Sequence, residues 1–182
     1  MGNGTDGRCE PGYLQPWRDG TIAGMGTQVS VTETVAAPTE AVYHLVADLP
    51  RMGEWSPESA GGRWLAGGGP RVGAKFKGAN RNGRHRWSTL VTITAAKPGE
   101  RFAFRVSAPV VPIADWAFHL TAIDGGCRIE HTWVDRRTWP VRVVSTLRTG
   151  VADRATFNRR SMEQTLASLK ATAEARTGVS AD

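Results

Sequence analysis

The pattern of hydrophobic and polar residues along this chain changes period near its C-terminal end. Between residues 147 and 175, apolar residues recur at steps of three and four, which is the spacing of one face of an α-helix. The pattern therefore predicts one long amphipathic helix. Its apolar stripe contains one polar residue, Asn158, and consists otherwise of Val151, Ala155, Met162, Leu166, Leu169 and Ala173.

Most of the chain before this helix has the period of two that is typical of β-strands. The first strand is predicted at 27–35, and Pro38 then opens a helix that ends at Pro50, with a short helical turn at 52–55. The remaining strands are expected at 63–66, 72–79, 84–95, 101–107, 113–123 and 127–135, separated by turn residues such as Asn82-Gly83 and Pro98-Gly99.

This order of elements predicts an α+β fold. One long helix has to cover the concave face of a curved antiparallel sheet of about seven strands, with two short helices after the first strand. The order leaves no room for parallel βαβ units, which argues against a Rossmann-type enzyme. A single helix on a large sheet usually leaves a hollow, so a functional site is expected between them.

The length of 182 residues suits one domain, predicted at 26–177, with a flexible C-terminus at 178–182. Residues 1–25 contain few apolar side chains and many glycines, so we expect a disordered tail. Met25 immediately precedes the first predicted strand, so the tail is also consistent with an upstream start codon assigned in place of Met25.

Cysteine usage and hydropathy bear on the compartment. Cys9 and Cys127 lie in unlike surroundings, and the sequence has no CxxC or Cys/His cluster. No run approaches the roughly 20 apolar residues of a membrane span, and the first residues lack the pattern of a secretion signal. We therefore expect a cytoplasmic protein without an integral membrane segment.

The net charge of +6 raises the question of nucleic acid. The basic residues are scattered, mostly arginine, and only 81–86 approaches a cluster, so no nucleic-acid partner is predicted. A basic rim that attracts an anionic small molecule, or transient contact with a membrane surface, fits this charge better. The expected assembly is a monomer or a homodimer.

Several local strings resemble the SRPBCC (START-like, helix-grip) superfamily, in particular its bacterial polyketide cyclase/dehydrase-like branch. The resemblance covers roughly residues 29–174. The strings that carry it are 35–38 with 47–48, 54–58, 73–76, 80–81 with 86–87, 98–99 with 102–104, 125–126 with Trp133, and 162–170.

The resemblance implies a seven-stranded sheet gripping the C-terminal helix, with an elongated cavity for sterols, lipids, polyketides or plant hormones. Related proteins include carriers, cyclases and hydroxylase subunits. The hydroxylase subunits carry an added Rieske domain, and this sequence lacks the Cys/His pattern for one. No cofactor and no metal are therefore expected.

Strand alternation indicates which side chains face the hollow, because successive residues point to opposite faces. In the last strand Cys127, Ile129, His131, Trp133 and Asp135 share the apolar, inward face. Ordinary core packing is the simpler explanation of any single aromatic residue, but together they favour an apolar ligand. The predicted ligand-binding residues are Asn80, Trp87, Phe104, Trp116, Phe118, Trp133, Asp135, Asn158 and Met162.

Two residues are candidates for catalysis. His131 could act as a general base, because a neutral imidazole in an apolar pocket can accept an activated α-proton. Arg81 could hold a carboxylate or enolate oxygen. The alternatives are a core histidine with satisfied hydrogen bonds and an exposed hairpin arginine.

The polar candidates have similar alternatives. Asn158 could contact a ligand carbonyl or hydroxyl, or bond to neighbouring backbone. Asp135 could orient His131, or pair with Arg136 or Arg137. A lid over the cavity is expected at 54–58, with residues Glu54, Trp55 and Glu58, although Trp55 could instead plug the core.

Three functions are consistent with these features. The first is a carrier or sequestering protein that binds an apolar small molecule, such as a lipid, sterol or polyketide. The second is a polyketide aromatase/cyclase-like enzyme that uses general acid and base residues and no metal. The third is a stress-response or toxin-type module that interacts with another protein through its basic surface.

Overall fold

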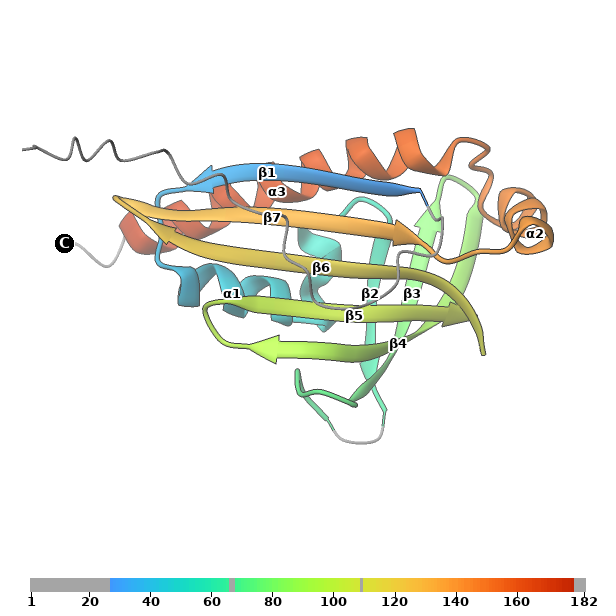
Figure 1. The fold of residues 1–182 in the computed structure, drawn as a ribbon, viewed down its shortest axis with the longest axis horizontal. Coiled ribbons are helices and arrows are strands. Elements are labelled where there is room, and N and C mark those ends of the chain that lie inside the picture. The colour runs from blue at the N-terminus through green and yellow to red at the C-terminus, as the bar shows by residue number, and fades with distance from the viewer. Residues whose placement is uncertain (1–26, 66–67, 109, 179–182) are drawn as a thin grey trace, which may run out of the picture.

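The computed structural model describes residues 27–65, 68–108 and 110–178, and the predicted tail at 1–25 lies outside them. Within the described ranges, one sheet contains seven antiparallel strands in the order β1-β7-β6-β5-β4-β3-β2 (Figure 1). This confirms the predicted α+β fold. The strands are β1 (Gln28–Val35), β2 (Ser59–Trp64), β3 (Lys75–Asn82), β4 (His85–Lys97), β5 (Arg101–Ala108), β6 (Val111–Ile123) and β7 (Gly126–Asp135).

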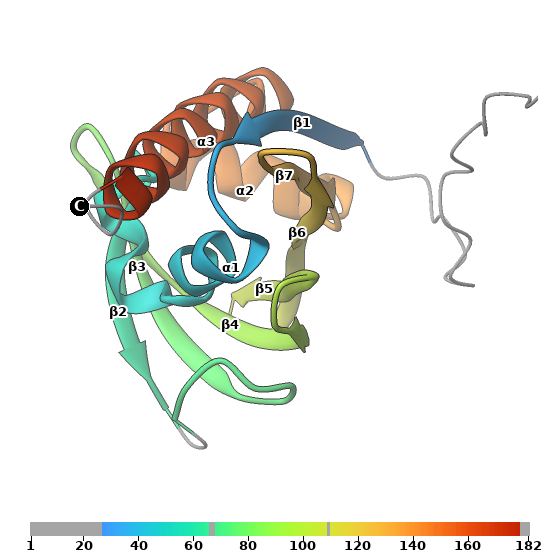
Figure 2. The same ribbon diagram turned by 90° about the vertical axis from the view of Figure 1, so that its left-hand side faces the viewer.

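In the described part of the chain, four helical segments accompany the sheet: α1 (Thr39–Ala47), the 3₁₀ helix η1 (Leu49–Glu54), α2 (Trp139–Thr149) and α3 (Arg154–Gly178). The sheet curves around α1, and α3 lies alongside β1 on the concave side (Figure 2). The short α2 lies at one end of the molecule, next to the hairpin between β3 and β4.

The prediction of one helix from residue 147 was wrong at its start, because the chain breaks at Gly150. This glycine adopts the left-handed conformation with φ +71°, and its N–H donates to the carbonyl of Thr146 at 2.8 Å. A new helix then begins behind Asp153, whose Oδ1 accepts from the backbone N–H of Thr156 at 3.0 Å. Leu147 therefore belongs to α2, and the rest of the predicted stripe to α3.

Two strand boundaries also differ from the prediction. The strand expected at 63–66 occupies Ser59–Trp64, and the one expected at 72–79 occupies Lys75–Asn82. Val72, counted as a strand residue from its apolar side chain, is 65% exposed in the connection between β2 and β3. Hydrophobicity alone placed it in the strand.

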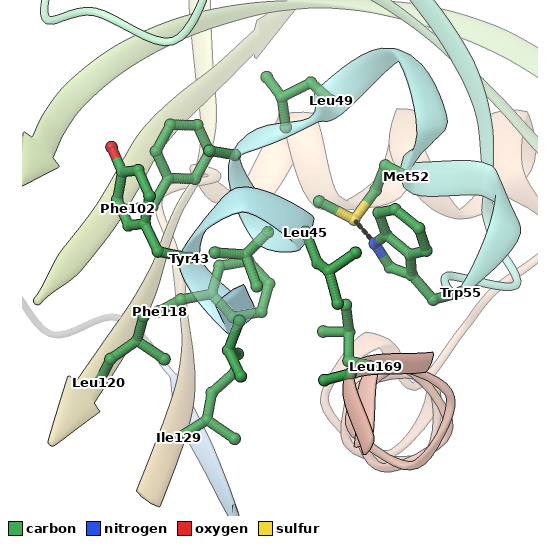
Figure 3. Packing of buried hydrophobic residues seen from close by; sticks show 14 of the residues in the cluster. Tyr43, Leu45, Leu49, Met52, Trp55, Phe102, Phe118, Leu120, Ile129 and Leu169 are labelled. Atoms are coloured by element: carbon green, nitrogen blue, oxygen red, sulfur yellow. Dashed lines mark hydrogen bonds between the residues drawn. The ribbon is translucent and has the colours of Figure 1, made fainter. Parts of the chain in front are cut away.

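The hydrophobic core occupies the half of the interior that α1 covers. Leu45 of α1 faces Leu169 of α3, and Phe102 and Phe118 pack from the sheet (Figure 3). Burying these side chains completely stabilises the fold by roughly 2 kcal/mol each. The other half of the interior, nearer α2, contains polar side chains and a cavity.

Candidate ligand-binding site

A cavity of about 160 Å³ lies between the sheet and the first turns of α3. Strand alternation turns every second side chain of β3 to β7 inward, and some of these inward side chains form its wall. Most of this wall is aromatic or aliphatic. The lining includes Trp87, Phe104, Val106, Trp116, Phe118, Trp133 and Met162, together with Asn80, His131 and Asn158.

Two buried polar atoms in this lining have no hydrogen-bond partner among the described residues. They are Nδ1 of His131, on β7, and Oδ1 of Asn158, on α3. The two residues are 5% and 2% exposed. Buried polar atoms in folded proteins are nearly always hydrogen-bonded, because leaving one unsatisfied costs about 1–3 kcal/mol. The two atoms therefore leave hydrogen-bonding capacity in the cavity wall unused.

The imidazole of His131 contacts two aromatic rings, those of Trp116 and Phe118. Burial lowers the pKa of His131 to about 3, because the cationic form loses its hydration. The side chain is therefore neutral at physiological pH and offers the cavity one donor and one acceptor nitrogen.

A larger groove, of about 650 Å³, opens beside the cavity. The pairing of β4 with β5 starts only at Leu90, opposite Ser107, so the first residues of β4 leave a sheet edge without a partner strand. The helix α2, the end of β5 and the start of β6 flank this edge. Groove and cavity share Trp87, Thr89, Ile113, Ser145 and Arg154, so the two spaces adjoin.

Arg154 marks the junction between cavity and groove, and the sequence analysis missed it. Its Nη1 donates to Oε1 of Glu58 at 2.5 Å, and both side chains are largely buried. The guanidinium also lies over the ring of Trp87, 6.0 Å from its centroid. The sequence signal was weak, since Arg154 is one of many arginines.

Most of the predicted ligand-binding residues lie together. Asn80 lines the cavity and donates from Nδ2 to Oγ1 of Thr89 at 3.2 Å. The other residues that the structure brings to the cavity wall are Trp87, Phe104, Trp116, Phe118, His131, Trp133, Asn158 and Met162.

Arg81 and Asp135 do not line this cavity. Arg81 is exposed, and its neighbour Asn80 takes the inward position. Asp135 is buried beyond the cavity, where Arg137 contacts its Oδ2 at 2.8 Å. Burial alone would raise the pKa of Asp135, but the hydrogen bonds from Arg137 outweigh it and lower the pKa.

The three predicted lid residues have different environments. Trp55 is buried in the core, where its Nε1 donates to Sδ of Met52 at 3.1 Å, as Figure 3 shows. Glu54 is exposed and pairs with Arg51 at 2.6 Å. Glu58 alone of the three lines the cavity.

The described residues contain no group of three or more His, Cys, Asp or Glu side chains that could hold a metal ion. No helix in the described part of the chain combines the length and apolarity needed to cross a membrane.

A curved sheet that grips a long helix around a largely apolar cavity defines a helix-grip protein. Residues 26–174 match the model of the family described as "Polyketide cyclase / dehydrase and lipid transport". The chain belongs to this family, as its resemblance to the SRPBCC superfamily indicated. No curated protein matches the sequence.

Solved structures share the fold at low sequence identity. The Polyketide_cyc-like protein Cgl2372 from Corynebacterium glutamicum has a TM-score of 0.59 and 23% identity, covering 85% of this chain and 95% of its own. The di-domain ARO/CYC StfQ from the steffimycin biosynthetic pathway has a TM-score of 0.65 and 15% identity. The match covers 84% of this chain and 52% of StfQ. Major latex-like protein 151 from Panax ginseng has a TM-score of 0.63 and 9% identity. The match covers 82% of this chain and 99% of the ginseng protein.

Proposed function

We propose that this protein is a carrier or sequestering protein for an apolar small molecule with one or two polar groups. The observation that carries the proposal is the pair of unpartnered atoms, His131 Nδ1 and Asn158 Oδ1, in an otherwise apolar cavity. A ligand hydroxyl can donate a hydrogen bond to the Asn158 oxygen, and a ligand hydroxyl or carbonyl can form a hydrogen bond with His131. The rest of the ligand would contact aromatic walls.

The two volumes limit the size and position of the ligand. A cavity of about 160 Å³ holds little more than one benzene-sized ring, whereas pockets for larger ligands usually measure about 300–1,000 Å³. A lipid, sterol or polyketide must therefore extend past Arg154 into the groove of about 650 Å³. We infer an elongated ligand whose polar end lies at His131 and Asn158.

The environment of His131 favours binding over proton abstraction. A conjugate acid with a pKa of about 3 makes this imidazole a base weaker by roughly a thousandfold than an ordinary histidine. Arg81, the other residue proposed for a cyclase, is exposed and does not line the cavity. The proposal of a carrier therefore requires fewer assumptions than that of an aromatase/cyclase-like enzyme. The likeness to StfQ supports the enzyme at the level of fold alone.

A cavity-filling variant tests this proposal. Val106 lines the cavity from β5, so Val106→Phe would occupy part of the space that the ligand needs. Val134→Phe adds the same bulk on β7, at a position that does not line the cavity, and serves as the matched control. Ligand uptake is measured by native mass spectrometry and by displacement of anilinonaphthalene sulfonate with fatty acids, sterols and aromatic polyketides.

We expect saturable, micromolar binding of at least one ligand class to the parent protein and to Val134→Phe. Val106→Phe should bind at least about tenfold more weakly. Absence of saturable binding by the parent, or equal binding by the two variants, would refute a ligand site in this cavity.

A further inference from the structure

The exposed large hydrophobic side chains of the described residues gather at one end of the molecule. All but Val72 lie on α2, on the turn between β5 and β6, or at the edge of the groove. They are Leu65, Val110, Val111, Trp139, Val143, Val144 and Leu147, and their exposure ranges from 38% for Val111 to 86% for Val110. We call the part of this set on α2 and the β5–β6 turn, from Val110 to Leu147, the apolar end patch.

The helix α2 presents its apolar side to solvent. With about 3.6 residues per turn, Trp139, Val143 and Leu147 follow one another along one side of the helix. These three side chains are 77%, 48% and 76% exposed. The side toward the groove is less apolar, with Val141 in line with Ser145 and Thr149. An amphipathic surface helix normally buries its apolar face, so this orientation indicates a partner surface.

The charged residues on α2 and on the adjoining turn are all basic. Neither α2 nor the adjoining β3–β4 turn at 82–86 contains an acidic residue. Asn82 of the turn donates from Nδ2 to the carbonyl of Thr149, which holds the turn against α2. The groove lining likewise contains no carboxylate. The basic residues at this end are Lys77, Arg84, Arg86, Arg142, Arg148 and Arg154. Two of them are paired with carboxylates, Arg142 with Asp135 at 3.5 Å and Arg154 with Glu58.

We propose that the apolar end patch docks on an anionic phospholipid bilayer. The apolar side of α2 would enter the boundary between headgroups and acyl chains, and the flanking arginines would contact lipid phosphates. Charge favours a bilayer over a second copy of the chain, because a symmetric contact through α2 would bring Arg148 of both copies together. In this orientation the groove opens toward the membrane beside the cavity.

The proposal goes beyond ligand binding, because docking of the protein itself requires no cargo. The test uses sucrose-loaded vesicles of phosphatidylcholine alone or with about 30 mol % phosphatidylglycerol, sedimented with the ligand-free protein. The variant V143E/L147E places two carboxylates on the outward side of α2, at positions that line neither cavity nor groove. V72E makes the same kind of change at the exposed valine outside the patch and is the matched control.

We expect the parent protein and V72E to bind the anionic vesicles at least about tenfold more tightly than the neutral ones. Binding should weaken as NaCl rises from about 0.05 to about 0.5 M. V143E/L147E should lose binding while keeping the circular dichroism spectrum and solution ligand affinity of the parent. Val106→Phe, if it loses ligand uptake, should still bind vesicles, which separates docking from the proposed carrier function.

Two results would overturn the proposal. One is the absence of vesicle binding by the parent, or equal binding by the parent and V143E/L147E. The other is a dimer of the parent in light scattering that V143E/L147E converts to a monomer, without vesicle binding by either. That result would assign the patch to a second copy of this chain.

Discussion

The imidazole of His131 lies flat against the ring of Phe118, with the ring centroids 3.9 Å apart and the planes tilted by 16°. The contact is part of a buried, largely aromatic environment, and this burial lowers the pKa of His131 to about 3. The neutral imidazole is compatible with this packing, whereas the imidazolium would have to give up its hydration.

The free energy of unfolding should therefore decrease as the pH falls below the unfolded-state pKa of His131. The unfolded chain takes up a proton at this position below pH 6.5, whereas the folded chain does so only near pH 3. Between these values the unfolded state binds more protons, so the free energy of unfolding decreases as the pH falls. From about pH 7.5 to about pH 5, we expect the parent to lose roughly 2 kcal/mol through this residue.

Urea unfolding of the parent and of His131→Leu at the two pH values checks this prediction. The variant has no group to titrate here and should lose correspondingly less stability. His119, whose pKa burial also lowers, is present in both proteins, so the difference between them isolates His131. Equal pH dependence of the two proteins would show that His131 does not cause the loss.

Asn158 should limit stability while it supports binding. Its Oδ1 is buried and unpartnered among the described residues, so Asn158→Leu removes an unsatisfied acceptor from an apolar cavity. We expect the free energy of unfolding to rise by about 1–2 kcal/mol and the ligand affinity to fall about tenfold. Urea titration and displacement of a bound ligand measure the two effects.

Asn82→Leu is the control, since its amide makes a hydrogen bond to the Thr149 carbonyl at 3.0 Å. Losing this bond should lower the free energy of unfolding by about 1 kcal/mol. If Asn158→Leu were destabilised like Asn82→Leu, Asn158 would be a structural residue of the fold and our assignment would fail.

Gly150 is predicted to be required for the break between α2 and α3. Its φ of +71° is one that side chains with a Cβ rarely adopt, and an added Cβ would lie 2.8 Å from Nε2 of His85. Gly150→Ala should lower the free energy of unfolding by about 1–2 kcal/mol, measured by urea titration. Gly125→Ala, at φ +74° with no atom near the added Cβ, is the matched control and should cost less. If both variants lose the same free energy of unfolding, the loss comes from the backbone conformation alone and not from the contact with His85.

This break also shows what the sequence allowed us to predict. The apolar period from Ala155 to Ala173 correctly identified α3, because burial against the sheet imposes that period. The same period carried the prediction through Gly150, although a glycine at the end of one helix and Asp153 before the next are ordinary boundary signals. Periodicity was given more weight than capping.

For the site, alternation was the informative signal. It placed His131 and Trp133 inward together, and it also puts Arg81 on the face opposite Asn80, which our catalytic assignment overlooked. No comparable pattern in the sequence predicted the ion pair of Glu58 with Arg154. The two residues are 96 positions apart and meet only through the curvature of the sheet.

The Glu58–Arg154 pair should control how fast a ligand moves between groove and cavity. Arg154 lines both spaces, and the 2.5 Å contact with Glu58 holds it against Trp87. Glu58→Gln weakens this contact, so we expect ligand association and dissociation to accelerate together, by about tenfold, corresponding to about 1.4 kcal/mol of barrier. Because both rates change alike, the equilibrium affinity should stay within about a factor of two.

Stopped-flow fluorescence measures the rates, with Glu54→Gln as control, since its ion pair with Arg51 is exposed and away from the cavity. Unchanged rates in Glu58→Gln, or equal acceleration in Glu54→Gln, would mean that the ligand does not pass this ion pair.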